Sequence, residues 1–281
     1  MILDGKSLSD KILENIKDEI IQNNFSPSLA VVLVGDDEAS KLYVSVKEKV
    51  CQKVGIKSVV KRFDKNITEN ELIREIESLN QDASVHAILV QLPLPNHINK
   101  FNVINSISPN KDVDGFTIHN TGCIDMGLEP YCYPCTPKGI IRILKEYNIP
   151  IEGKHAVVIG RSDIVGKPLA RMLLNLNATV TQCHSKTVNL ENYTKQADIL
   201  ISAVGKPKFI TSGMVKKGAV VIDVGISRVD GKLFGDVDLE NVKNIASYIT
   251  PVPKGIGPMT IAMLMENTYE LYKYQTELQL N

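Results

Sequence analysis

The sequence has no excess of charge of either sign, with 32 Lys and Arg residues against 32 Asp and Glu residues. Proteins that bind the phosphate backbone of nucleic acids usually carry a long basic stretch, which this sequence lacks. We therefore expect no nucleic-acid partner.

Long hydrophobic runs are also missing. The longest apolar runs are about six residues, far short of the ~20 that a membrane-spanning helix needs. The N-terminal segment lacks the basic and then apolar layout of a signal peptide. We therefore expect a cytoplasmic protein with no membrane partner.

The sequence has only five cysteines, and their spacing does not suit a metal site. Cys132 and Cys135 form a C-x-x-C pair, but a tetrahedral zinc site would need a second close pair. A redox pair would have its first Cys opening a helix directly after a strand. Thr136 and Pro137 instead look like the N-cap and the first residue of the next helix. We expect reduced, packed thiols and no bound metal.

What the sequence does contain is an alternation of short apolar runs with helical patterns, without internal repeats or low-complexity linkers. Apolar strands separated by helices predict parallel sheets that helices cover on both faces. A chain of 281 residues usually forms more than one core, so we expect two α/β domains with parallel sheets flanking a cleft. The expected strands are 29–34, 59–63, 85–90, 156–159, 178–182, 199–204 and 219–224, and the expected helices are 38–54, 68–80, 137–147, 168–176 and 257–274.

One of these strands is followed by glycines in an arrangement typical of nucleotide-binding turns. Gly160 permits a tight turn, Gly166 permits a close approach, and Pro168 suits the first helical turn. Free N–H groups at that helix end would face a pyrophosphate. The spacing is G-x5-G and not G-x-G-x-x-G, so a plain glycine turn in an α/β domain fits almost as well.

The end of the following strand indicates which dinucleotide would bind. NAD-selective sites usually carry an Asp or Glu there for the ribose hydroxyl, whereas this chain has Ser185 and Lys186. Arg161 adds a cation in the glycine turn. Together these residues could bind a 2′-phosphate, which favours NADP, although a solvated basic loop has the same composition.

A lysine stands on the apolar arc of the helix expected at 38–54. Counting about 100° per residue places Lys47 inside that arc, stacked one turn after Tyr43. Such a lysine either snorkels out to solvent or points into a cleft. In a cleft, loss of solvation would lower its pKa and make it usable as a general acid or base.

Two further polar residues come after the expected strand at 85–90. Gln91 stands at its carboxyl end, where ligands bind in parallel sheets. Asp114 precedes a glycine turn, although Asp-Gly is most often only a turn former. An amide and a carboxylate in one cleft could bind the hydrogen-bonding edge of a heterocycle, which neither residue identifies.

Several segments together resemble the bifunctional methylenetetrahydrofolate dehydrogenase/methenyltetrahydrofolate cyclohydrolase family, essentially from end to end. The resemblance implies NADP-dependent oxidation of 5,10-methylenetetrahydrofolate to 5,10-methenyltetrahydrofolate, then hydrolysis to 10-formyltetrahydrofolate. Residues 1–135 with the helix 260–281 would form a folate-binding catalytic domain, and residues 136–259 a Rossmann-like NADP-binding domain. The similar segments, in order, are Ser40–Lys47, Val90–Pro95, Lys111–Phe116, Pro134–Pro137, Gly160–Gly166, Gly235–Asp238 and Thr250–Thr260.

The resemblance also implies a role for each site residue. Lys47 would be the key cyclohydrolase group, and Tyr43 would position the substrate and tune Lys47. Gln91 would hydrogen-bond near Lys47, and Asp114 would hold the edge of the pterin ring. Tetrahydrofolate derivatives and a second copy of this chain, in a homodimer, are the expected partners. The residues expected to contact NADP are Gly160, Arg161, Ser162, Ser185 and Ile226.

The sequence departs from the family pattern at a few positions. Lys254 stands where the family usually has Gly, and Lys138 where Leu is common. Thr117–Asn120 replaces the commoner His-Pro-x-Asn. Lys254 matters most, because its loop would border the cleft and affect contacts with the folate tail.

Three alternatives remain open at this point. A single-activity member of the same family would have one of the two reactions impaired. Another two-domain NADP oxidoreductase, such as a shikimate-type dehydrogenase, would explain the nucleotide half but not the residues on the folate side. A non-catalytic nucleotide-sensing protein would require the position of Lys47 to be accidental.

Overall fold

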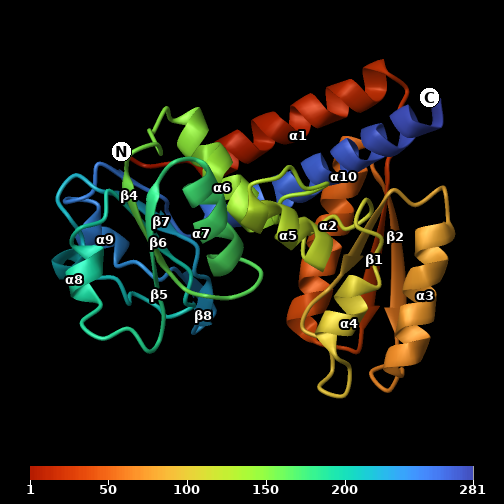
Figure 1. Ribbon diagram of the computed structural model, residues 1–281, viewed down its shortest axis with the longest axis horizontal. Coiled ribbons are helices and arrows are strands. Elements are labelled where there is room, and N and C mark those ends of the chain that lie inside the picture. Colours follow the sequence, from red (N-terminus) through yellow and green to blue (C-terminus); the bar gives the residue numbers. More distant parts are fainter. Residues whose placement is uncertain (281) are drawn as a thin grey trace. The chain divides into compact units, whose positions relative to one another are not determined.

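The structure, a computed structural model, describes residues 1–280 (Figure 1). The chain divides into two compact units. The five-stranded unit holds Met1–Asp10 and Pro134–Thr260, and the three-stranded unit holds Lys11–Tyr133 and the residues from Ile261 onward.

The first ten residues belong to the five-stranded unit, whereas the expected range 1–135 put them with the other one. Ile2 forms a parallel bridge with Ile249, and the N–H of Leu3 donates to the Ile249 carbonyl at 2.8 Å. The start of the chain thus pairs with a strand near the other end of the sequence, and no local sequence pattern predicts this pairing.

The three-stranded unit is built around β1 (Ser28–Val34). This strand pairs in parallel with β2 (Lys57–Phe63) on one side and with β3 (Ala87–Val90) on the other. All seven residues of β1 are buried, as expected for a central strand covered on both faces.

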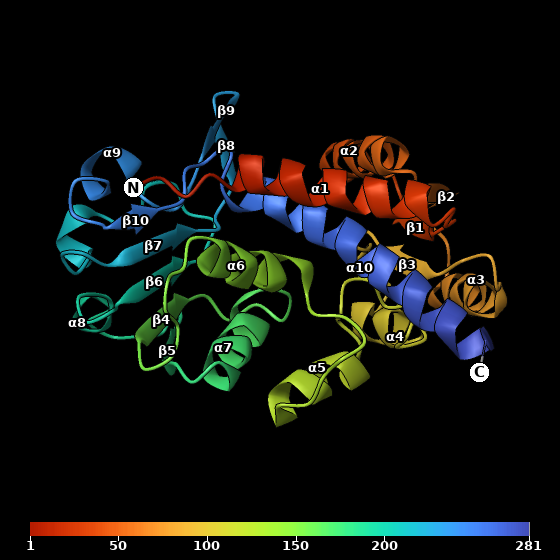
Figure 2. The same cartoon turned by 90° about the horizontal axis from the view of Figure 1, so that it is seen from above.

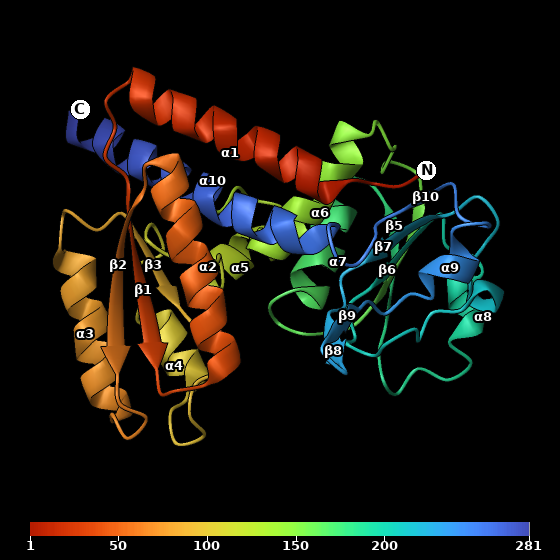
Figure 3. The same cartoon turned by 180° about the vertical axis from the view of Figure 1, so that it is seen from behind.

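Helices supply that cover. Figures 1 and 3 show α2 (Glu38–Val54) and α3 (Glu69–Gln81) on opposite faces of the sheet. Alternate residues of a strand point to opposite faces, so the even-numbered side chains of β1 all meet the α3 side. The cluster on that side includes Ala30, Val32 and Val34 together with Leu72, Ile76 and Leu79 of α3.

Both of these helices begin where the sequence pattern predicts, because their caps are local. The Asp37 carboxylate accepts the N–H of Ser40 at 2.7 Å, and Gly55 ends α2 in the left-handed conformation at φ 84°. At the start of α3, the Thr68 hydroxyl accepts the N–H of Glu71, and the Glu71 carboxylate accepts the N–H of Thr68 at 2.9 Å. This reciprocal pair is a capping box.

Two long helices, α1 (Gly5–Gln22) and α10 (Ile256–Leu280), contribute residues to both units, because the division falls within them. Helix α1 is not among the helices expected from the sequence, although its buried apolar residues recur at helical spacing. Within residues 1–280, no helix is both long enough and apolar enough to cross a membrane. The buried apolar residues of α1 are Leu8, Ile12, Leu13, Ile16 and Ile20.

The sheet of the five-stranded unit is entirely parallel and has the strand order β10-β7-β6-β4-β5. The chain runs from β4 out to β5 and then returns to β6 on the other side of β4. Open α/β sheets bind ligands at such a reversal, outside the carboxyl ends of the strands. The strands are β4 (His155–Ile159), β5 (Thr179–Cys183), β6 (Ile199–Ser202), β7 (Val220–Asp223) and β10 (Tyr248–Ile249).

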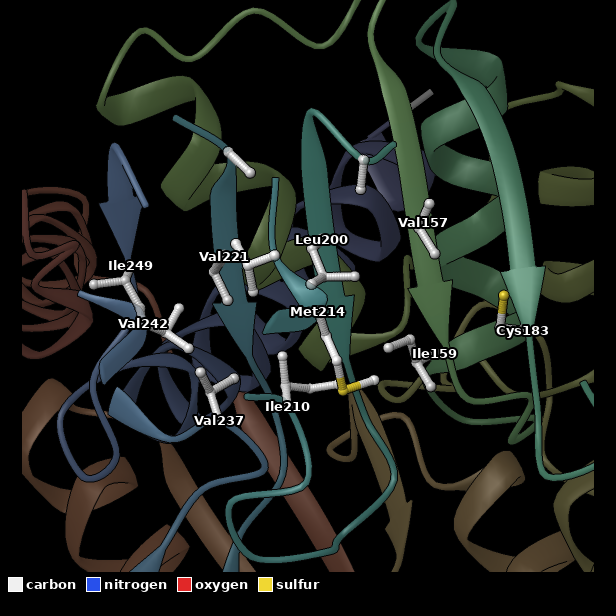
Figure 4. Close-up of a cluster of buried hydrophobic side chains, with 13 residues drawn as sticks. Val157, Ile159, Cys183, Leu200, Ile210, Met214, Val221, Val237, Val242 and Ile249 are labelled. Carbon is white, nitrogen blue, oxygen red and sulfur yellow. The ribbon is translucent and has the colours of Figure 1, made fainter. Parts of the chain in front are cut away.

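Helices cover both faces of this sheet as well. Figure 2 shows α6 (Cys135–Glu146) and α7 (Gly166–Asn175) on one face, and α8 (Glu191–Thr194) and α9 (Leu239–Val242) on the other. On the second face, strand side chains pack against Met214 and Val242 in a buried apolar cluster (Figure 4). The predicted pair of α/β units with parallel sheets is confirmed.

The smaller elements are α4 (Lys100–Asn105), α5 (Ile118–Met126), the 3-10 helix Ser212–Met214 and an antiparallel hairpin of β8 (Ser227–Val229) and β9 (Lys232–Phe234).

The expectation that Thr136 caps a helix is wrong. Helix α6 already begins at Cys135, with Pro134 as its N-cap, and the N–H of Lys138 donates to the Pro134 carbonyl at 2.9 Å. The Thr136 hydroxyl is hydrogen bonded to the hydroxyl of Thr260 at 2.9 Å. It therefore joins α6 to the start of α10 instead of capping its own helix.

We expect Asn267 to be important for the stability of the three-stranded unit. Its fully buried amide donates to the carbonyls of Val113 at 2.8 Å and of Tyr133 at 2.9 Å. Replacing Asn267 with Ala removes both donors, which should lower the free energy of unfolding in urea by roughly 2–4 kcal/mol. The matched control is Asn244→Ala, whose exposed amide donates to the Glu240 carbonyl and which should change stability by at most about 0.5 kcal/mol. Equal effects of the two changes would contradict this assignment.

Candidate functional site

Lys47 and Gln91 are brought together by α2 and the end of β3. The Lys47 Nζ donates to the Gln91 Oε1 at 2.9 Å, and both side chains are half-buried. Gln91 is itself held, because its Nε2 donates to the Leu92 carbonyl at 2.8 Å and its backbone N–H donates to the Val32 carbonyl at 2.9 Å. Lys47 therefore points to a fixed acceptor within its own unit and does not snorkel away from it.

The nature of this acceptor matters for the chemistry. An amide oxygen orients the Lys47 Nζ without the negative charge of a carboxylate, which would favour the ammonium form. A group that must both accept and release a proton is better served by a neutral partner. The pair can therefore act as a positioned proton donor and acceptor.

The first turns of α2 are more exposed than its predicted apolar arc suggests. Tyr43 is 49% exposed and Leu42 is 56% exposed, whereas Val44 and Cys51 are buried. Tyr43 lies one turn before Lys47, so the two side chains share a side of the helix. Its ring is thus available to a ligand that reaches Lys47.

Asp114 lies in a segment that buried polar groups hold in place. Asp112 is 1% exposed, and its carboxylate accepts the N–H of the α5 N-cap residue at 2.8 Å and the side-chain amide of Asn120 at 2.9 Å. A parallel bridge between Ile88 and Asp112 joins the segment to β3. Asp114, half-buried, follows two residues later and so lies at the same end of β3 as Gln91.

The glycine turn after β4 shows why its glycines have the unusual spacing. Gly160 has φ 132°, and a Cβ there would lie 2.7 Å from the Ala203 carbonyl oxygen. A Cβ at Gly166 would lie 2.3 Å from the Gly160 carbonyl oxygen. The two glycines therefore pack against each other and against the segment after β6, which leaves no room for a side chain at either position.

The expectation of free N–H groups at the start of α7 is wrong. The Ser162 hydroxyl accepts the N–H groups of Val165 at 3.2 Å and of Gly166 at 3.4 Å, and the Ser162 carbonyl accepts the N–H of Lys167 at 3.1 Å. Pro168 has no N–H to offer. Ser162 thus satisfies the helix end that a pyrophosphate was expected to meet, and any phosphate there would compete with it.

The other residues expected to contact the nucleotide gather at the carboxyl edge of the sheet. Arg161 follows β4 and Ser185 follows β5, two adjacent strands, and both residues are exposed. Ser185 lies in a tight turn in which the N–H of His184 donates to the Thr187 hydroxyl at 2.9 Å. Ile226 follows β7 at the same edge and is 44% exposed. The predicted cation and hydroxyl thus follow the carboxyl ends of two adjacent strands.

Sequence reasoning missed the buried polar residues where β6 and β7 end. Asp223 is 3% exposed, and its carboxylate accepts the N–H groups of Asp236 at 2.8 Å and Val237 at 2.9 Å. Asp236 is fully buried and accepts the Ser202 hydroxyl at 2.9 Å. A signal for both was present, since Ser202 and Asp223 each end an otherwise apolar strand and Asp236 stands in the segment Gly235–Asp238.

The departure at Lys254 has a backbone consequence. This residue has φ 82°, in the left-handed region that favours glycine. Its carbonyl accepts the N–H of Lys6 at 3.0 Å, so the backbone there is held from outside the loop.

The side chain of Lys254 also acts on a nearby carboxyl group. Hydrogen bonds from Ser7 chiefly, and to a lesser extent the charge of Lys254, lower the pKa of Asp4. The chain keeps the backbone turn that a glycine would give and adds an exposed cation.

None of the five cysteines forms a disulfide within residues 1–280. Burial raises the pKa of the Cys51 thiol to about 12 and also raises the pKa of Cys183, which keeps both groups in the unreactive thiol form. In the part of the chain that the structure describes, no group of three or more His, Cys, Asp and Glu side chains could hold a metal ion.

The chain matches two domain descriptions of one family, Tetrahydrofolate dehydrogenase/cyclohydrolase. The catalytic domain matches residues 3–114, and the NAD(P)-binding domain matches residues 134–276. These two matches cover most of the chain and coincide broadly with its two sheets.

Individual proteins are similar over the same length. The bifunctional protein FolD of Thermodesulfovibrio yellowstonii is 56% identical over 278 residues, which are 98% of this chain and 97% of that protein. The solved structure of the bifunctional enzyme FolD, methylenetetrahydrofolate dehydrogenase/cyclohydrolase, from Campylobacter jejuni has a TM-score of 0.95 at 53% identity and covers 98% of this chain and 99% of its own. The Trypanosoma brucei FolD structure, complexed with NADP cofactor and inhibitor, has a TM-score of 0.93 at 35% identity and covers 98% of both chains.

Asp223 should make stability depend on pH. Burial is the main cause that raises its pKa to about 7, and the nearby charge of Asp236 adds to this, while backbone N–H groups oppose it. Between the ordinary value of 3.8 and about 7, the unfolded chain has lost the proton that the folded chain keeps. The stability that this group contributes in acid is therefore lost as pH rises through that interval.

We therefore expect the free energy of unfolding of the Asp223→Asn variant, relative to the original chain, to rise by roughly 2–3 kcal/mol between pH 5 and pH 8. Urea denaturation at several pH values measures this. In the control Asp198→Asn, the difference should stay constant over the same range, because a hydrogen bond from Lys216 chiefly lowers the pKa of Asp198. A constant difference for Asp223→Asn would contradict the assignment.

Proposed function

Because this chain belongs to the tetrahydrofolate dehydrogenase/cyclohydrolase family, we propose that it uses NADP for the dehydrogenase reaction and Lys47 for the cyclohydrolase reaction. As a bifunctional member, it oxidises 5,10-methylenetetrahydrofolate to 5,10-methenyltetrahydrofolate and hydrolyses that product to 10-formyltetrahydrofolate. Because the family matches extend over most of the chain, they exclude two of the alternatives, an unrelated NADP oxidoreductase and a non-catalytic sensor.

The hydrogen bond between Lys47 and Gln91, at 2.9 Å, carries the proposal for the cyclohydrolase step. Water must lose a proton as it attacks the methenyl carbon, and a ring nitrogen must gain one as its bond to that carbon breaks. A positioned lysine can accept the first proton and supply the second. Gln91 keeps the Lys47 Nζ in one place while this happens.

The dehydrogenase step requires orientation more than proton transfer. The methylene carbon releases a hydride because the resulting cation is delocalised over two nitrogens, and NADP, when bound, accepts that hydride. The residues of the five-stranded unit fit such a ligand, because an exposed cation and a hydroxyl follow the carboxyl ends of two adjacent parallel strands, β4 and β5, where ligands bind in such sheets. Arg161 and Ser185 would hold the 2′-phosphate, while Ser162 and Ile226 would contact the rest of the nucleotide.

The remaining residues have supporting roles in this proposal. Asp114 would accept hydrogen bonds from the pterin edge, and Tyr43 would stack on or position the folate beside Lys47. A homodimer, which the resemblance to the family implies, stays a prediction. The folate itself would present neutral N–H groups and an anionic tail, so one carboxylate suits the ring and cations suit the tail.

The variant Lys47→Met tests the proposed proton transfer. Met keeps a similar length and packs easily, so the fold should survive. Cyclohydrolase activity should fall by at least ~100-fold, the usual effect of removing a general acid or base. Dehydrogenase activity should persist in part, so that methenyltetrahydrofolate accumulates and its absorbance rises. The control Lys49→Met changes an exposed lysine on the same helix and should keep both activities. Formation of the formyl product at the original rate would refute the role of Lys47.

The variant Arg161→Ala tests the choice of cofactor. Loss of a charge-assisted hydrogen bond to a phosphate should weaken NADP binding by roughly 10- to 100-fold. NAD has no 2′-phosphate, so its affinity should change by less than about threefold. Calorimetric titration with each nucleotide measures both values, and Arg171→Ala on α7 is the control. Equal losses for the two nucleotides would show that Arg161 does not bind the 2′-phosphate.

A further inference from the structure

The segment that follows β6 lies at the reversal of strand order in the five-stranded sheet. Ala203 continues from β6 beside β4, and its N–H donates to the Ile159 carbonyl at 2.9 Å. The close packing of Gly160 against the Ala203 carbonyl puts this segment directly beside the glycine turn. A nucleotide bound on that turn would therefore border residues 203–206.

One buried carboxylate holds this segment. The Asp236 Oδ2 accepts the Ser202 hydroxyl at 2.9 Å and the N–H of Val204 at 2.8 Å, and its Oδ1 accepts the N–H of Lys206 at 2.8 Å. Asp236 is fully buried. Three donors from a stretch of five residues thus converge on a single side chain that comes from elsewhere in the sequence.

Asp236 is in turn fixed from the end of β7. The Asp223 carboxylate accepts the N–H groups of Asp236 and Val237, and the Asp223 N–H donates to the Thr250 hydroxyl at 2.7 Å. The fit around the two carboxylates is tight, because a Cβ at Gly225 would lie 1.9 Å from the Asp236 Oδ1. The segments after β6 and β7 are therefore locked to each other through Asp223 and Asp236.

We infer that Asp236 is a positioning residue for the nucleotide, which acts by holding residues 203–206 in the conformation that the bound dinucleotide requires. The inference rests on the proposed placement of NADP at this edge of the sheet. Asp236 does not touch the ligand in this account, because the segment that it holds lies between them. Residues 203–206 would border the part of the ligand that NADP and NAD share. The 2′-phosphate, which only NADP has, would instead lie at Arg161 and Ser185, on the side of the turn that faces β5.

A purely structural role would use the same hydrogen bonds, so the test must separate nucleotide binding from folding. In Asp236→Asn, the amide nitrogen has to face a backbone N–H, of either Val204 or Lys206, and that bond is lost. The affinity for NADP and for NAD, measured by calorimetric titration, should fall by about 10- to 100-fold for both. Hydrolysis of methenyltetrahydrofolate without any nucleotide should stay within about twofold, which shows that the three-stranded unit is folded. An unchanged far-ultraviolet circular dichroism spectrum should show the same for the five-stranded unit, which holds Asp236.

Two more variants complete the test. Ser202→Ala removes one donor to Asp236 and leaves the charge, so both nucleotides should bind about three- to tenfold more weakly. Asp198→Asn changes a carboxylate at the opposite, amino edge of the sheet, where it accepts the N–H of His155 at 3.0 Å. That control should leave nucleotide affinity unchanged.

The outcomes are distinct. Unchanged affinity for both nucleotides in a folded Asp236→Asn, or a loss confined to NADP, overturns the inference. If Asp236→Asn does not fold, unchanged affinity in Ser202→Ala overturns it instead. If the original chain binds neither nucleotide, the proposed cofactor site fails, and that result is recognised before any variant is made.

Discussion

Buried polar side chains hold the functional residues of both units, because a buried polar group that loses its hydrogen bonds costs far more free energy than one that keeps them. In the three-stranded unit, Asp112 and Asn267 hold the segment of Asp114 from two sides. In the five-stranded unit, Asp223 and Asp236 hold the segments that follow β6 and β7. The apolar sheets and their helices tolerate changes in shape more easily than these groups tolerate a lost partner.

Local signals explain which parts of the fold could be predicted from the sequence. The bounds of α2 follow from Asp37 and Gly55, which cap it from positions next to the helix. Helical periodicity placed Lys47 on the inward side of α2, but it could not identify Gln91 as its partner. The two residues are 44 positions apart and meet because α2 packs on the sheet that contains β3. The Asp236 network was missed for this reason too. Its donors come from a segment about 30 residues earlier in the chain, at Val204 and Lys206.

The turn after β4 illustrates a limit of motif reasoning. The glycines predict a bare backbone where a phosphate could approach, whereas a Cβ at Gly160 or Gly166 would meet protein backbone, so the packing of the turn itself requires both glycines. The motif does not predict that Ser162 occupies the N–H groups of the helix end. At the proposed cofactor site, phosphate binding would therefore come from side chains such as Arg161, or from displacement of the Ser162 hydroxyl. Either route makes the affinity depend on side chains more than the helix dipole alone would suggest.

The two reactions make different demands, and the proposed sites would meet them with different kinds of group. Hydrolysis moves protons, so it needs a titratable side chain in a fixed place, and in the proposed site the hydrogen bond between Lys47 and Gln91 would supply one. Hydride transfer moves no proton on the enzyme, and its rate falls steeply when the reacting atoms are misplaced. It therefore depends on rigid backbone around the nucleotide, and at the proposed nucleotide site a carboxylate that binds two backbone N–H groups and a hydroxyl would provide that rigidity. Because Asp236 is buried behind the segment that it holds, it stiffens the site without occupying the space that the nucleotide needs.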